Sequence, residues 1–327
     1  MDKKVLETYK FYFTNERLKL IILPTEQCNF RCPYCWEDYQ YGRMKRPTIN
    51  GIKSLLSNRA KTLKLLEIEW FGGEPLLAVD IISEISKHIQ ELQKKYSSLV
   101  YRGSMTTNGY LLDNNIFNEL YNLGIIRYCI CLDGFAEIHN ETRKLANGEG
   151  TFDTILNNLL SMKKTNTNFD LIITIHYFKE NYLETVKPLI TSINKNFMND
   201  NRFKVLFKSI QRLGGKNDCE IKIITSREEQ EIQNYLLKFV KDVYIIHKSE
   251  YYVCDASALN TMVIRSNGNI GKCIVATKED CNKVGKINTD GTLDLDNKKY
   301  LVWSNGFETE NKDFLTCPLK FVKNKII

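Results

Sequence analysis

The sequence predicts an α/β fold, in which parallel strands alternate with helices, followed by a small β-rich C-terminal part. Up to residue 248, apolar runs of strand length recur, and each precedes a segment whose apolar residues have helical spacing. This alternation is typical of a parallel sheet with right-handed crossovers. Beyond it, short strands flank Asn-Gly and Asp-Gly turns. We therefore expect a core over 1–248 and a second domain over 249–327 that packs against it.

The strands are expected where apolar runs end at glycine, proline or polar residues. The first is Leu18 to Leu23, an apolar run with one lysine that ends at Pro24, as a buried parallel strand does. The expected core strands cover 18–23, 65–71, 101–106, 125–132, 170–176 and 202–210. In the C-terminal part, Asn267-Gly268 and Asp290-Gly291 predict two tight hairpins.

The helices between these strands are marked by residues that favour helix ends. They are expected from 48 or 50 to 63, and over 79–96, 113–123, 152–164, 182–197 and 226–246. Asp113 and Thr151 are predicted N-caps, and Gly124 is predicted to end the third helix. Ser226 with Glu229 three residues later predicts a capping box at the start of the last helix.

Composition is that of an ordinary globular protein, with 43% hydrophobic and 26% charged residues in 327. No apolar run is long enough for a membrane span, and no secretion signal follows the first methionine. Ten cysteines without an export signal favour reduced thiols and metal over disulfides. We therefore expect a cytoplasmic enzyme of an anaerobic cell.

The net charge of +7 comes from scattered lysines and not from a basic block. This distribution indicates a solvated surface and predicts neither a nucleic-acid partner nor a membrane partner. A slight preference for an acidic peptide is the weaker alternative.

Three thiols follow the first strand in the segment Cys28-Asn29-Phe30-Arg31-Cys32-Pro33-Tyr34-Cys35. A cubane iron–sulfur cluster has four irons, and each needs a ligand. Three closely spaced cysteines would hold three irons and leave the fourth open for a substrate or a cofactor. Zinc is the alternative, but a zinc site uses four ligands, usually in two pairs. No second pair follows at zinc-finger spacing.

This octapeptide resembles the signature of the radical S-adenosylmethionine (SAM) enzymes. The resemblance implies that Cys28, Cys32 and Cys35 hold a [4Fe-4S] cluster whose open iron chelates the methionine moiety of SAM. One electron then breaks a carbon–sulfur bond and yields a 5′-deoxyadenosyl radical, while the aromatic ring of Tyr34 shields the cluster. The resemblance also implies that the core is a partial (β/α)6 barrel. Its active site would lie at the C-terminal strand ends.

The segment Gly72-Gly73-Glu74-Pro75 follows the second strand, where an active-site loop is expected. Glycine lets the backbone approach a ligand closely, and a carboxylate accepts hydrogen bonds from an ammonium group. By itself such a segment is most often a turn. At this place it resembles the family's methionine-binding motif, which implies that Gly72, Gly73, Glu74 and Pro75 bind the cofactor.

Polar residues at later strand ends resemble further family motifs. Thr107 and Asn108 correspond to the third-strand motif that approaches the adenosine, with a hydrogen-bonded turn as the alternative. Leu132-Asp133-Gly134, followed by His139 and Arg143, is similar to a pattern in peptide and sulfatase maturases. The resemblance implies that Asp133 binds the ribose and Arg143 the methionine carboxylate; a structural salt bridge is the alternative.

Three further residues lie on the fourth and fifth strands. His176 ends the fifth strand, where it could reach the nucleoside or the substrate, although such a histidine is more often structural. Cys129 and Cys131 share one face of the fourth strand, because side chains alternate along a strand. We interpret these two cysteines as small apolar core residues.

A second set of cysteines lies in the C-terminal part. Cys254 and Cys273, with Gly268 between them, are similar to the opening of the SPASM or twitch appendage, which holds auxiliary iron–sulfur clusters. The resemblance implies that Cys281 and Cys317 complete one auxiliary [4Fe-4S] cluster. A full SPASM region continues with further cysteines, but here Cys317 is followed by none. The appendage therefore carries one cluster, or is truncated, or is a cluster-free β lid.

The sequence thus predicts a radical SAM enzyme that abstracts hydrogen from a peptide or protein substrate. The expected activity is that of a ribosomal-peptide maturase forming a crosslink or an oxidised side chain, with a flavodoxin or ferredoxin as the reducing partner. A sulfatase-maturating oxidase is the nearest alternative, although Cys273 is followed by Ile274-Val275 and not by an acidic residue. A non-catalytic iron–sulfur or zinc-binding protein is the alternative of another class, and it would need no methionine site.

Overall fold

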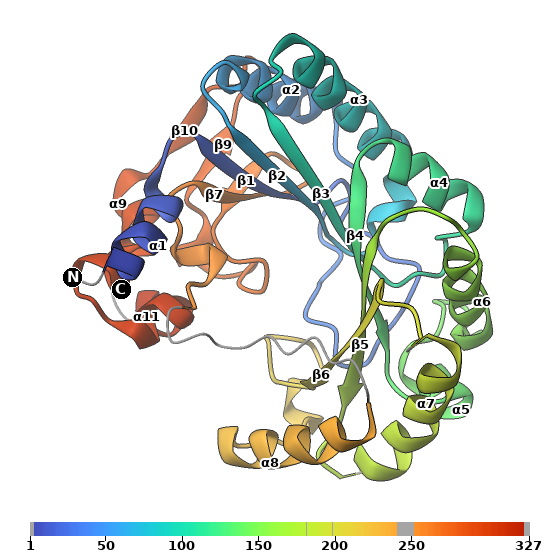
Figure 1. The fold of residues 1–327 in the computed structure, drawn as a ribbon. Coiled ribbons are helices and arrows are strands. Elements are labelled where there is room, and N and C mark those ends of the chain that lie inside the picture. The colour runs from blue at the N-terminus through green and yellow to red at the C-terminus, as the bar shows by residue number, and fades with distance from the viewer. Residues whose placement is uncertain (1–2, 181, 198, 241–251, 324–327) are drawn as a thin grey trace. The chain divides into compact units, whose positions relative to one another are not determined.

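A computed structural model describes residues 3–180, 182–197, 199–240 and 252–323. The chain forms two compact units. The first unit comprises 1–27, 39–104 and 247–327, and the second comprises 28–38 and 105–246. Each unit is described by itself below, with the elements as labelled in Figure 1.

The first unit is built on a sheet with strand order β10-β9-β8-β7-β1-β2. Its strands are β1 (Arg17–Ile22), β2 (Leu65–Trp70), β7 (Thr261–Ile264), β8 (Asn269–Gly271), β9 (Gly285–Ile287) and β10 (Leu293–Leu295). The central strand β1 pairs in parallel with both β2 and β7, whereas β7 to β10 are antiparallel. The C-terminal strands therefore extend the same sheet that begins with the first strand.

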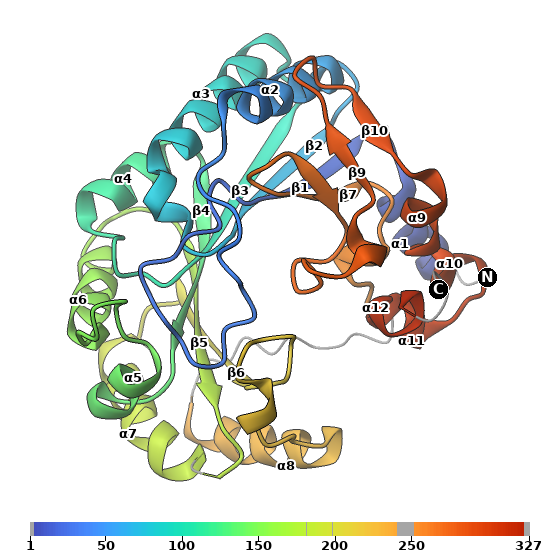
Figure 2. The same ribbon diagram turned by 180° about the vertical axis from the view of Figure 1, so that it is seen from behind.

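Helices complete the first unit. They are α1 (Lys3–Phe13), α2 (Arg46–Ala60), η1 (Pro75–Ala78), α3 (Val79–Lys95), η4 (Asp255–Ser257), η5 (Asp280–Asn282), α9 (Asn297–Val302), α10 (Asn305–Glu308), α11 (Lys312–Thr316) and α12 (Leu319–Val322). Both ribbon views place α2 and α3 side by side on one face of β1 and β2 (Figures 1 and 2). Both predicted hairpins are confirmed, with Gly268 and Gly291 at φ of 86° and 85°.

Some elements of the first unit were not expected. The sequence analysis placed no helix before the first strand, but α1 is present, and four short helices follow β10. Helix α2 begins at Arg46, earlier than the predicted start at 48 or 50. Pro47 occupies its first turn, where a missing backbone N–H costs nothing.

The second unit contains the parallel strands β4 (Ile125–Leu132), β5 (Asp170–Tyr177) and β6 (Phe203–Ser209), in that order. Strand β3 (Val100–Thr107) is divided between the two units. The helices are α4 (Asn114–Asn122), α5 (Ala136–Thr142), α6 (Phe152–Lys163), α7 (Tyr182–Asn196), η2 (Asp218–Glu220), α8 (Ser226–Leu236) and η3 (Leu237–Phe239). In both views α4, α6 and α7 lie on the same side of the strands (Figures 1 and 2).

The two faces of β4 differ in burial. Tyr128, Ile130 and Leu132 are at most 2% exposed and belong to the apolar core. Cys129 and Cys131 alternate with them and are only half-buried. The predicted sharing of one face is confirmed, but the interpretation of these cysteines as buried, small apolar core residues is wrong.

Helix starts in the second unit test the predicted caps. Asp113 caps α4 as predicted, because its carboxylate accepts from two backbone amides of the first turn. Thr151 makes no cap with its side chain; the Asn140 side chain accepts from the amides of 151 and 152 instead, at 2.8 and 3.0 Å. Helix α5, which carries Asn140, occupies a segment predicted as loop.

The capping box of α8 lies one residue earlier than predicted. Thr225 and Glu228 form it, in place of Ser226 and Glu229. Threonine and serine can both cap a helix, and the sequence presents them in succession, each with a glutamate three residues later. The predicted end of this helix at 246 lies outside the described residues.

The parallel α/β core and the C-terminal extension that the sequence predicts are confirmed, and the sheet is open. The predicted domain boundary near residue 248 lies outside the described residues and stays a prediction. In the described part of the chain, no helix is both long and apolar enough to cross a membrane.

Candidate functional site

The cysteine loop belongs to the second unit and is anchored at two places. Its backbone pairs with the segment after α5: the amide of Arg31 donates to the carbonyl of Lys144 at 3.0 Å, and that of Ala146 donates to Asn29 at 2.8 Å. Phe30 is 1% exposed, so its aromatic ring is the buried anchor of the loop. These contacts fix the loop to the segment that follows α5.

The second anchor is Asn108, predicted as an adenosine contact. Its amide donates to the Asn29 side chain at 2.8 Å and approaches the Cys28 sulfur at 3.9 Å. The backbone amide of Phe30 also donates to the Cys28 sulfur, at 3.3 Å. Hydrogen bonds to a sulfur stabilise its thiolate, the form that binds iron. In this structure Asn108 supports the cysteine loop, and neighbouring Thr107 closes the turn with a bond to the amide of Gly109 at 3.1 Å.

The three thiols of this loop suit an iron–sulfur cluster in their chemistry. All are half-buried and none forms a disulfide. Burial raises the pKa of Cys32 to about 12, so without metal this sulfur is protonated and iron must displace the proton. A cubane places irons and sulfides between its ligands, so its thiolates spread over a wider space than those around a single ion.

Asp133 is the centre of a buried polar network at the end of β4. Its side chain is 1% exposed. One carboxylate oxygen accepts hydrogen bonds from the hydroxyls of Tyr34 and Thr142, the latter at 3.0 Å. The other lies 3.3 Å from Nδ1 of His176 and 3.9 Å from the guanidinium of Arg143. Asp133, Arg143 and His176, predicted separately from three segments, thus meet at one place.

Neighbouring side chains determine the protonation state of Asp133 in this network. Burial alone would raise the pKa of Asp133, but the guanidinium of Arg143, with His176, holds it well below its ordinary value. Arg143 also donates to the hydroxyl of Tyr34 at 2.9 Å. Tyr34 therefore ties the cysteine loop to the strand ends, a role in addition to the predicted shielding.

One donor of this network has no acceptor. The Nε of Arg143 is buried and has no hydrogen-bond partner among the described residues. A guanidinium nitrogen left without an acceptor is costly unless a ligand supplies one. His139, by contrast, is fully satisfied: its nitrogens lie 3.3 Å from the amide of Asp133 and 3.1 Å from the hydroxyl of Thr151. Burial lowers the pKa of His139 to about 4, so it is a neutral structural residue.

The glycine segment after β2 belongs to the first unit. Gly72 has φ of +124°, and a Cβ there would lie 2.2 Å from the carbonyl oxygen of Thr25. A Cβ on Gly73 would lie 2.4 Å from the carbonyl oxygen of Gln27. Both glycines are therefore required for the close approach of two backbone segments. The amide of Glu74 donates to Gln27 at 2.9 Å, directly before the first cysteine of the loop.

Glu74 is fully buried. One of its carboxylate oxygens accepts from the amide of Leu76 at 3.0 Å and so caps η1, which begins at Pro75. An ammonium group bound here would therefore compete with the amide of Leu76 for this carboxylate, or share the carboxylate with it. The predicted cofactor residues at 72–75 belong to the first unit and those at 107–176 to the second.

Three of the four C-terminal cysteines act on one another electrostatically in the first unit. The thiol of Cys254 interacts electrostatically with those of Cys273 and Cys317, and burial raises its pKa to about 12. Backbone amides of Val275 and Ala276 point at the Cys273 sulfur. Such amides are common around cluster sulfurs, because they stabilise thiolate.

The fourth cysteine is placed differently. Cys281 lies in η5 and is 6% exposed, and its raised pKa comes mainly from burial. Its neighbour Asn282 holds Cys273 by accepting from its amide and donating to its carbonyl, at 2.9 and 2.8 Å. Lys323 acts electrostatically on both Cys273 and Cys281. The thiols of Cys254, Cys273 and Cys317 thus act on one another electrostatically, and a cluster held by these three with Cys281 stays a prediction.

Sequence reasoning missed two buried charges near these residues. Lys272 is 1% exposed, donates to the carbonyl of Thr261 at 2.7 Å and lies 4.4 Å from the ring centre of Tyr300. Burial lowers the pKa of Lys272 to about 7. Arg265 forms a buried ion pair with Glu26 at 2.6 Å, and Glu26 precedes the cysteine loop by two residues. Neither residue lies in a motif, so only the fold could identify them.

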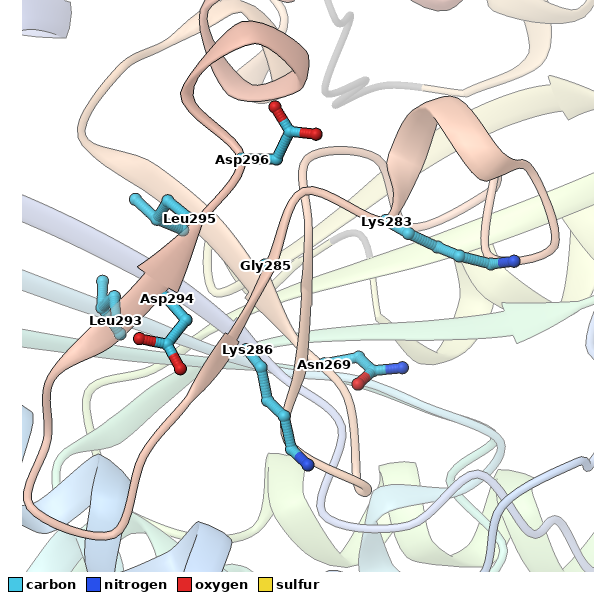
Figure 3. Close-up of a pocket in the computed structure, with 8 residues that line it drawn as sticks. All are labelled: Asn269, Lys283, Gly285, Lys286, Leu293, Asp294, Leu295 and Asp296. Carbon is cyan, nitrogen blue, oxygen red and sulfur yellow. The ribbon is translucent and has the colours of Figure 1, made fainter.

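A hollow of about 700 Å³ lies over the antiparallel strands β8 to β10 (Figure 3). Its polar lining mixes both charge signs, with Lys283, Lys286, Asp294 and Asp296. None of the predicted site residues lines it. The hollow is therefore separate from the residues that carry the expected chemistry.

Known proteins share sequence with about half of this chain. A cysteine-type anaerobic sulfatase-maturating enzyme of Clostridium novyi (strain NT) is 24% identical over 179 residues, 52% of this chain and 46% of that enzyme. Its counterpart from Clostridium perfringens (strain 13) is 28% identical over 169 residues, 48% of this chain and 44% of that enzyme. The chain thus spans less than half the length of these two relatives.

Solved structures share the fold over most of the chain. Native anSMEcpe with bound AdoMet has a TM-score of 0.64 and 20% identity, covering 91% of this chain and 82% of that one. Streptococcus suis SuiB bound to its precursor peptide SuiA has a TM-score of 0.62 and 20% identity, covering 98% and 74%. The family model described as the Radical SAM superfamily matches residues 22–189, just over half of this chain. The chain therefore belongs to the radical SAM superfamily, whose enzymes use a [4Fe-4S] cluster and S-adenosylmethionine.

Proposed function

We propose that this radical SAM enzyme abstracts a hydrogen atom from a peptide or protein and matures a ribosomal peptide, forming a crosslink or an oxidised side chain. The observation that carries the proposal is the presence of two separate sets of thiols in one chain. Cys28, Cys32 and Cys35 lie on one anchored loop, and Cys254, Cys273 and Cys317 interact electrostatically in the other unit. A second cluster suits an enzyme that must accept an electron from a substrate radical.

The first three thiols would hold the main cluster. When bound, the cluster and SAM supply one-electron cleavage of a carbon–sulfur bond and a radical that abstracts hydrogen. The chain holds the cysteine loop rigid through Asn108 and through the network of Tyr34 and Asp133. These residues fix the direction in which the loop presents its thiols.

Cofactor binding is assigned to the strand-end segments. The unpartnered Nε of Arg143 supports a role in binding the methionine carboxylate. Gly72, Gly73, Glu74 and Pro75 would bind the methionine ammonium through backbone and carboxylate oxygens. Thr107, Asn108, Asp133 and His176 would lie toward the nucleoside, and Asp133 would act mainly by holding Arg143 and Tyr34, because both of its oxygens are already engaged.

The neighbours favour a peptide substrate. SuiB was solved with its precursor peptide SuiA, and an anSMEcpe structure holds AdoMet and a peptide. A flavodoxin or ferredoxin would supply the electron, and the oxygen-sensitive clusters suit the cytoplasm of an anaerobic cell. A sulfatase-maturating oxidase is the second candidate, because three sulfatase-maturating enzymes are among the relatives.

Formation of 5′-deoxyadenosine tests the catalytic proposal. The full chain, reconstituted with iron and sulfide without oxygen, should form it from SAM and dithionite. Cys32→Ala should abolish the product, whereas Cys219→Ala, which removes an exposed thiol, should not. Equal product from Cys32→Ala and the unmodified chain would disprove the ligand assignment. Zinc in place of iron in the anaerobically purified protein would favour the non-catalytic alternative.

A binding measurement tests the methionine segment separately. Glu74→Gln removes a negative charge but keeps a side chain that can cap η1. We expect weaker SAM binding by anaerobic calorimetry, by about tenfold for one lost charge-assisted hydrogen bond, with the main cluster's iron retained. An unchanged dissociation constant would contradict the role of Glu74.

A further inference from the structure

A second hollow, of about 530 Å³, lies at the start of helix α2 in the first unit, and we call it the α2 hollow. Residues from three segments line it: 40–48, 266–267 and 286–289. Its volume falls in the range of small-ligand sites, about 300–1,000 Å³. None of its lining residues is acidic, whereas Asp294 and Asp296 line the hollow of Figure 3.

Two lysines leave their charge free in the α2 hollow. Lys45 and Lys286 are exposed, and the ammonium group of neither pairs with a carboxylate in the described parts of the chain. The third cation of the lining is Arg43, whose guanidinium binds both carboxylate oxygens of Asp80, at 2.5 and 2.6 Å. Its charge is therefore compensated. The two lysines give the hollow a net positive potential, which attracts an anionic group.

The first turn of α2 adds to this potential. Its N-cap, Lys45, makes no cap with its side chain, and the turn contains no acidic residue. The uncompensated N-terminus of a helix favours an anion. Thr48 lies in this turn, lines the hollow and is 8% exposed, and its hydroxyl has no hydrogen-bond partner among the described residues. A buried polar group without a partner is costly, so this hydroxyl suits a ligand that accepts a hydrogen bond.

The α2 hollow lies at the end of the sheet where the expected chemistry takes place. Strands β1 and β7 are parallel, so the segments that follow them leave the sheet at the same edge. The turn at 266–267 follows β7 and lines the hollow. Thr25 follows β1 and forms a β-bridge with Arg43 of the lining. In parallel α/β folds, the active site is at this C-terminal edge.

Gln27 connects the α2 hollow with the segment proposed to bind SAM. Its side-chain amide donates to the carbonyl oxygen of Tyr41, which belongs to the lining, at 3.0 Å. Its own carbonyl oxygen accepts from the amide of Glu74 at 2.9 Å. A single residue thus joins the two places, so a ligand held in the hollow has a defined position relative to Glu74.

We propose that the α2 hollow binds an acidic side chain of the peptide substrate and so positions the peptide, an inference that rests on the proposed function for the identity of the substrate. A carboxylate would balance the charges of Lys45 and Lys286, and the hydroxyl of Thr48 can donate to it. Tyr41 and Pro47 give the lining apolar surface as well. This mixture suits a peptide segment better than a free inorganic anion.

Selection from a library of random peptides tests the site without knowledge of the natural substrate. The reconstituted full chain is immobilised without oxygen, and the peptides that it retains are sequenced. We expect enrichment of aspartate and glutamate, and its loss in the double variant Lys45→Gln with Lys286→Gln. Lys61→Gln with Lys94→Gln is the matched control, because it removes two exposed lysines of the same unit that do not line the hollow. This control should retain the enrichment.

Fluorescence anisotropy of the most enriched peptide, labelled with an uncharged dye, gives the size of the effect. Its dissociation constant should rise about tenfold in the Lys45 and Lys286 double variant. Thr48→Val keeps the shape of the side chain but removes the hydroxyl, and should raise the constant by about threefold. Replacing the acidic residues of the peptide by their amides should weaken binding to the unmodified chain and have little effect on binding to the double variant.

Three outcomes would overturn the proposal. They are selected peptides without acidic residues, equal enrichment on the Lys45 and Lys286 double variant, and displacement of the peptide by micromolar inorganic phosphate, which would identify a site for a free anion. Formation of 5′-deoxyadenosine from SAM is measured on the same preparations. A chain that binds acidic peptides but forms none contradicts the proposed function and retains the site, whereas a chain that forms it but enriches no acidic peptide contradicts this inference alone.

Discussion

Replacement of Asp133 by asparagine tests the buried network directly. The change keeps the size of the side chain but removes the charge that faces Arg143 and His176. The side chains of Asp133 and Arg143 are 1% and 9% exposed, so water cannot compensate for the loss. Breaking a buried ion pair by removing one partner costs about 3–5 kcal/mol. We expect a loss of this size in the free energy of unfolding.

Urea denaturation of the full, iron-free chain at pH 7, followed by circular dichroism, measures this loss. For a slope of about 3 kcal/mol per molar urea, the midpoint should fall by about 1 to 2 M. Tyr34→Phe removes one hydroxyl that forms hydrogen bonds with both Asp133 and Arg143. It should lower the free energy of unfolding by less than Asp133→Asn does, by about 1.5–3 kcal/mol. Asp170→Asn is the matched control, because Asp170 is 45% exposed and its pairing with Lys204 should contribute less than about 1 kcal/mol.

The reasoning about the network would be refuted by an Asp133→Asn variant within about 1 kcal/mol of the unmodified chain. The pH dependence gives a second check. The pKa of Asp133 is lowered in the folded protein, so its contribution is complete above the unfolded pKa of about 4. That contribution is lost as the pH falls below this value. The stability difference between Asp133→Asn and the unmodified chain should therefore shrink in acid.

Three further changes probe the first unit. Gly72→Ala should lower the free energy of unfolding by about 3 kcal/mol or more, because the new Cβ would lie 2.2 Å from a backbone carbonyl oxygen at a residue with positive φ. Gly42→Ala, where the new Cβ meets open space, should lower it far less in the same urea assay, and equal losses would contradict the argument. Arg265→Met leaves Glu26 buried without its ionic partner and should lower the free energy of unfolding by about 3–5 kcal/mol. A urea midpoint equal to that of the unmodified chain would show that the ion pair is dispensable. Cys254→Ser should lower the iron content by about four per chain if the C-terminal thiols hold a cluster, and unchanged iron would indicate a cluster-free lid.

Local patterns in the sequence were sufficient for most elements. Alternating apolar runs and helical spacing predicted the parallel strands, because each pattern reports which face of an element is buried. The turns at Asn267-Gly268 and Asp290-Gly291 were predictable because positive φ restricts the choice of residues. The cysteine loop was recognisable because three iron ligands must lie close together in the chain.

The tertiary structure decided which side chains meet. Tyr34, Asp133, Arg143 and His176 come from separate segments, so no local pattern could show that the carboxylate binds the other three. For the same reason, the sequence presented four C-terminal cysteines as equals, and only the fold shows that the thiol of Cys254 interacts electrostatically with those of Cys273 and Cys317. Hydrophobic periodicity is a property of neighbours in sequence, but a polar network depends on distances across the fold, which only packing sets.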